Sequence, residues 1–169
     1  MDYAERFNMV YREWRKFING IPVNNNYILS PLILDSWERC RSKRINPYLT
    51  SVPVVLKDDE LQGRLEANRE LIDVSLPFLN NLYRLVVGSG FIVALFDTEG
   101  YMLKLIGDAD VLERVKRGNF IVGACWSEEV AGTNGAGTAL KLRKPLQVYA
   151  AEHYCINSHK WTCSGAPIH

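Results

Sequence analysis

The sequence has little that would tie it to a membrane, to nucleic acid or to an oxidising compartment. No apolar run in its 169 residues comes near the roughly 18 residues that a membrane-spanning helix needs. A net charge of +1 is too small for a protein that binds nucleic acid mainly through its overall field. The first residues lack the basic and then apolar order of a secretory signal, and the four cysteines show no tight pairing. We therefore expect a soluble, cytoplasmic protein with reduced thiols and no membrane contact.

Two glycine-rich stretches lack what a nucleotide site requires. Gly132 and Gly137 have the spacing of a phosphate-binding loop, but Thr138 follows where that loop has its lysine. Gly88-Ser89-Gly90 precedes an apolar run typical of a strand, whereas a dinucleotide-binding glycine loop follows a strand. The sequence thus predicts no nucleotide hydrolysis, no enzymatic activity and no cofactor.

What is present is the composition of a globular domain and several helix signals. Hydrophobic residues make up 47% of the chain and charged residues 23%, which excludes a disordered protein. Residues 2–18 carry an aromatic stripe at helical spacing, and Ser30 followed by Pro31 is typical of a helix cap and first turn. The stripe consists of Tyr3, Phe7, Val10, Trp14 and Phe17.

Residues 58–87 form the longest periodic segment, which predicts one long helix with a kink at Pro77. Its apolar residues follow a heptad-like seam that Asn68 interrupts. The seam consists of Leu61, Leu65, Ile72, Leu79, Leu82 and Val86. Since the stripe and the seam present more apolar surface than one small sheet can cover, we expect a helix bundle that forms a homodimer.

The period then changes from helices to strands. Residues 90–96 and 101–106 predict a β-hairpin, with Asp97-Thr98-Glu99-Gly100 as its turn. Short helices are expected at 108–117, 126–131 and 136–143, and further strands at 145–150 and 162–168. Helices around an antiparallel sheet make the predicted fold class α+β.

The last third of the chain concentrates polar and aromatic side chains on short, glycine-broken elements. Apolar walls with a few placed hydrogen-bonding groups are typical of a small-molecule pocket. We predict a ligand-binding pocket in which Glu128, Asn134 and His153 form hydrogen bonds, and in which His153 titrates near neutrality. The predicted pocket residues are Trp126, Glu128, Thr133, Asn134, Tyr149, His153 and Trp161. A second interpretation of Glu128, as an acid in the first turn of a helix, stays open.

The same region resembles a known family. W-S-E-E-V-A-G-T-N-G-A-G-T-A-L, then E-H-Y-C and W-T-C-S-G-A-P-I-H, are similar to the N-terminal GAF sensory domain of sigma-54-dependent activators of the acetoin/glycerol-metabolism type. S-P-L-I-L-D-S-W-E-R-C-R-S-K-R-I-N-P resembles that family's first conserved helix. The resemblance implies a GAF fold that receives a small metabolite or a protein signal and relays it through helices. It also implies that contacts with DNA and RNA polymerase belong to domains absent from this chain.

The resemblance suggests a division of the chain into three parts. Residues 1–57 form an N-terminal helical region, residues 58–87 a connecting helix, and residues 88–169 a truncated GAF-like core. The chain ends at His169, where the family continues into a further sheet strand. Arg44 stands where the family has glycine, and Gly135-Ala136 replaces a bulkier pair, which we expect to loosen the packing there.

Two other functions stay open from the sequence alone. Cys155, His159 and Cys163 are metal-capable or redox-active side chains, although their spacing is not that of a zinc site. They suggest a redox, metal or haem sensor as the alternative to metabolite binding. A purely structural dimerisation module, with a pocket that no longer binds anything, is the other alternative.

Overall fold

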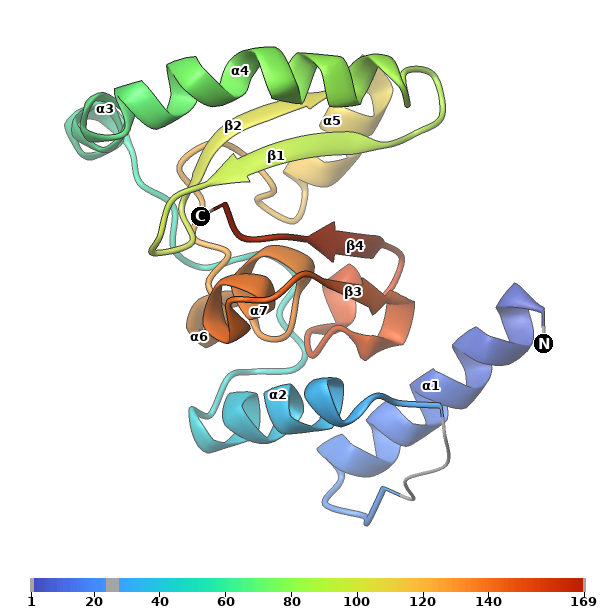
Figure 1. The fold of residues 1–169 in the computed structure, drawn as a ribbon. Coiled ribbons are helices and arrows are strands. Elements are labelled where there is room, and N and C mark those ends of the chain that lie inside the picture. The colour runs from blue at the N-terminus through green and yellow to red at the C-terminus, as the bar shows by residue number, and fades with distance from the viewer. Residues whose placement is uncertain (1, 24–27, 169) are drawn as a thin grey trace. The chain divides into compact units, whose positions relative to one another are not determined.

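The computed structural model describes residues 2–23 and 28–168 (Figure 1). Contacts within it divide the chain into two compact units. Unit 1 comprises Met1–Thr50 together with Ser127–His169, and unit 2 comprises Ser51–Trp126. Unit 1 is therefore assembled from two segments that lie far apart in the sequence, and each unit is described by itself below.

Unit 1 begins with two capped helices. α1 (Tyr3–Ile18) starts at Asp2, whose carboxylate accepts a hydrogen bond from the backbone of Glu5 while Glu5 bonds back to the cap. α2 (Pro31–Ser42) starts at Ser30, whose hydroxyl accepts from the backbone N–H of Ile33. The remaining elements of unit 1 are α6 (Glu128–Ala131), α7 (Gly135–Leu142), β3 (Leu146–Tyr149), the 3₁₀ turns η1 (Ala150–Glu152) and η2 (Ile156–Ser158), and β4 (Thr162–Gly165).

The core of unit 1 is organised around two tryptophans. Trp14 from α1 and Trp37 from α2 are fully buried. Each ring nitrogen donates a hydrogen bond to the backbone of the C-terminal segment, Trp14 to Tyr154 O at 2.9 Å and Trp37 to Glu152 O at 2.7 Å. These bonds satisfy carbonyls that burial would otherwise leave unpaired. The two N-terminal helices are thereby tied to η1 and the residues after it.

β3 and β4 pair antiparallel, with Leu146 opposite Gly165. A methyl group on Gly165 would lie 1.9 Å from the carbonyl oxygen of Gly135, and one on Gly135 would lie 2.7 Å from the Cβ of Cys163. The backbones of β4 and α7 thus lie in close contact at Gly165 and Gly135. The expectation that Gly135 loosens this packing is wrong, because the missing side chain permits closer approach rather than leaving space.

Unit 2 consists of helices packed on a hairpin. Its elements are α3 (Asp58–Ala67), α4 (Arg69–Arg84), β1 (Ile92–Phe96), β2 (Met102–Gly107) and α5 (Ala109–Lys116). β1 and β2 pair antiparallel with a bulge near Phe96, and α4 packs along them (Figure 1). Asp97 holds the turn, since its buried carboxylate accepts from the backbone of Glu99 and Tyr101.

The single helix expected over residues 58–87 is divided. α3 ends and α4 begins at Asn68, whose amide donates to the carbonyl of Arg64 at 2.9 Å and so caps α3. Asn side chains compete with helical hydrogen bonds in this way. Pro77 lies inside α4, which continues to Arg84.

The α+β class is confirmed, and the predicted short helices and strands are found within a few residues of their expected bounds. Within the described residues the strands form two separate two-stranded sheets rather than one. The helices expected to form one bundle are divided, with α1 and α2 in unit 1 and α3 and α4 in unit 2. The division of the chain at residues 57 and 87 stays a prediction.

Candidate functional site

A buried polar cluster joins α2 to the start of α6. Glu128, which is 4% exposed, accepts hydrogen bonds from the hydroxyl of Ser36 at 2.6 Å and from the guanidinium of Arg39 at 2.6 and 2.9 Å. The Ser36 hydroxyl also lies 2.7 Å from that of Thr133, and the thiol of Cys40 lies 3.6 Å from Thr133. We call these five residues the Glu128 cluster. It satisfies a buried carboxylate inside the protein.

The charges of the Glu128 cluster support each other. Burial raises the pKa of Glu128, but hydrogen bonds from Arg39, Ser36 and Thr138 outweigh burial, so the pKa lies below its ordinary value. The hydrogen bond between Arg39 and Glu128 also raises the pKa of Arg39. Burial raises the pKa of Cys40 to about 11, which keeps its thiol neutral. Glu128 is therefore an anion whose counter-charge is supplied by α2.

The polar residues after Glu128 form local backbone contacts. Asn134 caps α7, because its side-chain oxygen accepts from the N–H of Gly137 at 2.9 Å and its amide donates to Gly132 O at 2.8 Å. The hydroxyl of Thr138 accepts from the backbone N–H of Asn134 at 3.2 Å. These bonds fix the turn between α6 and α7. Thr133, in the same turn, reaches Glu128 through the hydroxyl of Ser36.

His153 and His159 are both buried and neutral. The Nδ1 of His153 donates to Ala150 O at 2.8 Å, and the Nε2 of His159 donates to His153 O at 3.0 Å. Burial lowers the pKa of each imidazole to about 4. The expectation that His153 titrates near neutrality is therefore wrong, since its enclosed site disfavours the cation.

The three predicted aromatic residues lie in different places. Trp126 belongs to unit 2, where its ring packs edge-on against that of Phe120, with the two ring centres 4.8 Å apart. Trp161 belongs to unit 1, is partly exposed, and lies beneath the ammonium of Lys160 at 5.6 Å. Tyr149 is 7% exposed, and the guanidinium of Arg6 lies 4.2 Å from its ring centre. The seven-residue pocket stays a prediction.

A cleft of about 650 Å³ opens in unit 1 beside Tyr149. Its polar lining includes Arg6 from α1 and Glu152 from η1, with Arg6 Nη2 3.5 Å from Glu152 Oε1. The other carboxylate oxygen of Glu152 accepts from the Tyr149 N–H at 2.8 Å, and burial raises the pKa of Glu152. The full lining is Arg6, Ile28, Leu29, Ser30, Pro31, Ile33, Gln147 and Glu152.

Sequence reasoning missed this cleft except for its neighbour Tyr149. The volume falls within the range of small-molecule sites, and the lining combines apolar walls with polar groups of both charges. Arg6 reads in the sequence as an ordinary charge on the polar side of α1. Only Glu152, next to the predicted His153, carried a signal, because an acid inside the apolar run A-A-E-H-Y-C is expected to need a partner.

The surroundings of Cys155, His159 and Cys163 give little support to a metal or redox role. Burial raises the pKa of Cys155 to about 12 and that of Cys163 to about 11, so the reactive thiolate is scarce at neutral pH. Across residues 2–23 and 28–168, no three side chains of the histidine, cysteine, aspartate or glutamate type are grouped so that they could hold a metal ion.

In that same part of the chain no helix is long and apolar enough to cross a membrane.

Comparison with known proteins finds that the chain is similar to the N-terminal parts of a family of regulators. The family model described as "MimR, N-terminal domain" matches residues 11–169. The acetoin dehydrogenase operon transcriptional activator AcoR of Bacillus subtilis (strain 168) is 37% identical over 156 residues, which are 92% of this chain and 26% of that protein. A signal-transduction and transcriptional-control protein of Clostridium beijerinckii is 34% identical over 85% of this chain and 23% of its own length.

The propane 2-monooxygenase operon transcriptional activator MimR of Mycolicibacterium goodii is 28% identical over 83% of this chain and 23% of its own length. The chain thus spans about a quarter of each of these relatives. They are named for transcriptional control and not for an enzymatic activity, which agrees with the regulatory family expected from the sequence.

A solved structure shares the fold. The crystal structure of the E. coli DhaR(N)–DhaL complex matches with a TM-score of 0.77 at 19% identity, over 82% of this chain and 47% of that one.

Proposed function

Because the chain belongs to the family of the MimR N-terminal domain, we propose that it is the signal-input domain of a sigma-54-dependent activator, with a GAF-type fold. The relatives it matches are named as regulators of transcription, and the matched segment is a small part of each. Contacts with DNA and RNA polymerase then belong to other parts of the regulator, which works in the cytoplasm. The chain pairs as a homodimer through its helices and relays its signal along them.

The proposed signal is a small metabolite bound in the cleft beside Tyr149. The observation that carries this proposal is the pairing of Arg6 with Glu152 on apolar walls, in a volume of about 650 Å³. At 3.5 Å the pair is loose, and a small polar molecule with both donors and acceptors can insert between a guanidinium and a carboxylate. Leu29 and Ile33 supply apolar contact for its carbon atoms.

A thermal-shift screen tests this site. We expect the melting temperature to rise by several degrees with at least one small hydroxyketone, diol or carbonyl compound, acetoin included. A ligand at one hundred times its Kd stabilises the native state by about 2.7 kcal/mol. Arg6→Ala removes one polar wall and is expected to abolish most of the shift, whereas Arg15→Ala, on the exposed side of the same helix, is expected to keep it.

The outcomes separate the site from the function. A shift that persists in Arg6→Ala would place the ligand elsewhere, with the seven predicted residues as the next candidates. Absence of a shift with every probe would remove the small-molecule signal and leave the structural dimerisation module or a protein signal.

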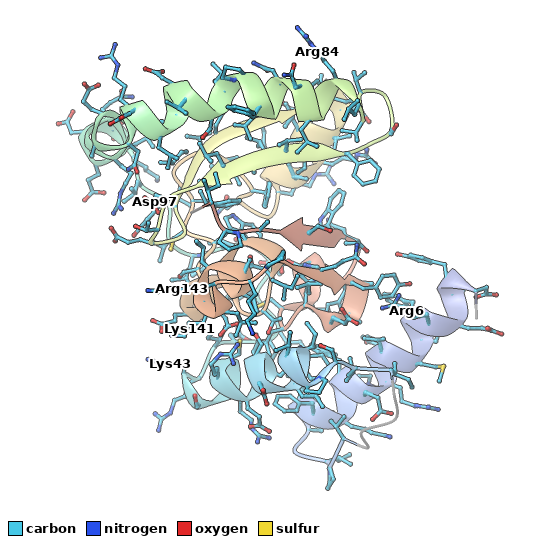
Figure 2. The ribbon with its side chains drawn as sticks, in the orientation of Figure 1. Arg6, Lys43, Arg84, Asp97, Lys141 and Arg143 are labelled. Carbon is cyan, nitrogen blue, oxygen red and sulfur yellow. The ribbon has the colours of Figure 1, made fainter. Side chains whose placement is uncertain are left out.

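A protein signal is the second candidate, because the solved neighbour is described as a complex of DhaR(N) with DhaL. Unit 1 offers a basic surface where α2 and α7 end. Lys43 and Lys141 approach the exposed Glu129 at 3.9 and 3.4 Å, and Arg143 follows at the end of α7 (Figure 2). This surface suits an acidic protein partner. Retention of partner binding by a Lys141→Glu, Arg143→Glu variant would rule it out.

A further inference from the structure

One side of α4 carries a row of apolar side chains that the β1–β2 hairpin does not cover. Ser75, on the side that faces the hairpin, is 8% exposed, whereas Phe78 is 71% and Leu85 82% exposed. Monomeric proteins seldom leave so continuous an apolar surface in water. We call this row the α4 stripe. It consists of the exposed Val74, Phe78 and Leu82 of α4, the exposed Leu85 directly after the helix, and the partly buried Leu71.

The α4 stripe has the spacing of a helix–helix contact and is symmetric about Phe78. Leu71 and Leu85 lie seven residues to either side, and Val74 and Leu82 lie four residues to either side. Steps of three and four residues keep side chains on one face of a helix. When two copies of the helix are placed antiparallel, each residue of the stripe therefore faces another residue of the stripe in the second copy. A two-fold contact between identical copies requires this kind of self-complementary surface.

The charges beside the stripe favour the antiparallel orientation. Glu70 and Arg84 flank it at equivalent heptad positions, and neither side chain forms an ion pair within the described residues. Figure 2 shows Arg84 on the side of α4 that faces away from the hairpin. In an antiparallel pair, Glu70 of one copy lies opposite Arg84 of the other, twice. In a parallel pair the two copies of this flanking position would lie on opposite sides of the interface, so Glu70 and Arg84 could not pair.

We propose that the α4 stripe is the surface through which two copies of this chain pair, antiparallel about a two-fold axis near Phe78. The proposal rests on the homodimer of the proposed function and narrows it to one helix, one face and one orientation. The seam expected from the sequence is largely a different face. Its members Ile72 and Leu79 lie on the same side of α4 as the buried Ser75.

Sedimentation velocity on the full chain tests the pairing. The parent chain is expected to be a dimer at tens of micromolar. Phe78→Glu places a carboxylate at the axis in both copies and is expected to weaken association by more than about 100-fold, since two large apolar side chains lose their burial. Ile21→Glu changes an apolar residue that is 53% exposed and lies outside α4, and it is expected to leave the dimer intact.

A charge exchange tests the orientation without touching the apolar residues. Arg84→Glu is expected to weaken the dimer, and the double variant Glu70→Arg, Arg84→Glu to restore it, with circular dichroism confirming that each variant is folded. A monomeric parent would overturn the homodimer, and a dimeric Phe78→Glu would overturn the α4 stripe alone. Failure of the double variant to restore pairing would overturn the antiparallel arrangement. The thermal-shift result in the cleft is independent of all three.

Discussion

Gly165→Ala is expected to destabilise the protein by about 3 kcal/mol or more, the upper end of what overpacking costs. The added methyl group would stand 1.9 Å from the carbonyl oxygen of Gly135 and 2.5 Å from its carbonyl carbon. Both are backbone atoms, so no side chain can rotate away, and either β4 or the start of α7 must move. For a chain of this length the melting temperature should fall by roughly 6–12 °C.

Gly63→Ala is the matched control for this change. Gly63 lies in α3, and a methyl group there meets no atom within 4 Å. Alanine has the higher helix propensity, so this variant is expected to gain about 0.4–1 kcal/mol. Equal stability of the two variants would contradict the backbone contact between Gly135 and Gly165.

Arg39→Met is expected to cost about 3 kcal/mol at neutral pH, because it leaves the buried carboxylate of Glu128 without its counter-charge. Arg39 is itself 32% exposed in its side chain, so we take the low end of the range for such pairs. The folded protein holds the pKa of Glu128 below its ordinary value of 4.5. The stabilisation from the carboxylate is thus present above about pH 4.5 and is lost as the pH falls through the lowered pKa.

The difference between parent and variant should therefore shrink in acid, as the pH falls through the lowered pKa of Glu128 in the parent. Urea denaturation at pH 7 and at a series of pH values below 4.5 measures it. Lys43→Met provides the comparison, since the ion pair of Lys43 is with the exposed Glu129 at 3.9 Å and its loss should change stability by no more than about 0.5 kcal/mol. A pH-independent loss in Arg39→Met would mean that packing, rather than charge, accounts for the effect.

The helices and turns that depend on neighbouring residues could be predicted from the sequence. The errors concern positions whose structure depends on tertiary contacts. Ser30-Pro31 and the turn at Asp97 act through neighbouring backbone atoms, so their helix and hairpin could be predicted. Asn68 lies in a continuous apolar pattern, and only the three-dimensional structure shows that one helix ends and the next begins there. Gly135 was misread because its contact partner, Gly165, lies thirty residues further along the chain.

The candidate site was predictable only in part, for the same reason. The polar residues after Cys125 stand out in the sequence, yet their partners do not: Glu128 is neutralised by Arg39 of α2, and Asn134 is occupied as a cap. Whether a buried polar group binds a ligand or the protein itself depends on segments distant in sequence. The cleft at Arg6 and Glu152 joins residues from the two ends of the chain, which no local pattern signals.

The two-segment construction of unit 1 has a consequence for synthesis on the ribosome. α1 and α2 emerge first, but the carbonyls of Glu152 and Tyr154 that receive Trp37 and Trp14 are translated after all of unit 2. Until then the nascent chain displays two large aromatic rings that pack against Tyr11 and Phe17 but lack their partners in the C-terminal segment, and exposed apolar surface of this kind is prone to aggregation. Unit 2 is contiguous and has its partners as soon as it is made. The N-terminal helices are thus the first part of unit 1 to be synthesised and must wait for the last part before they can be buried.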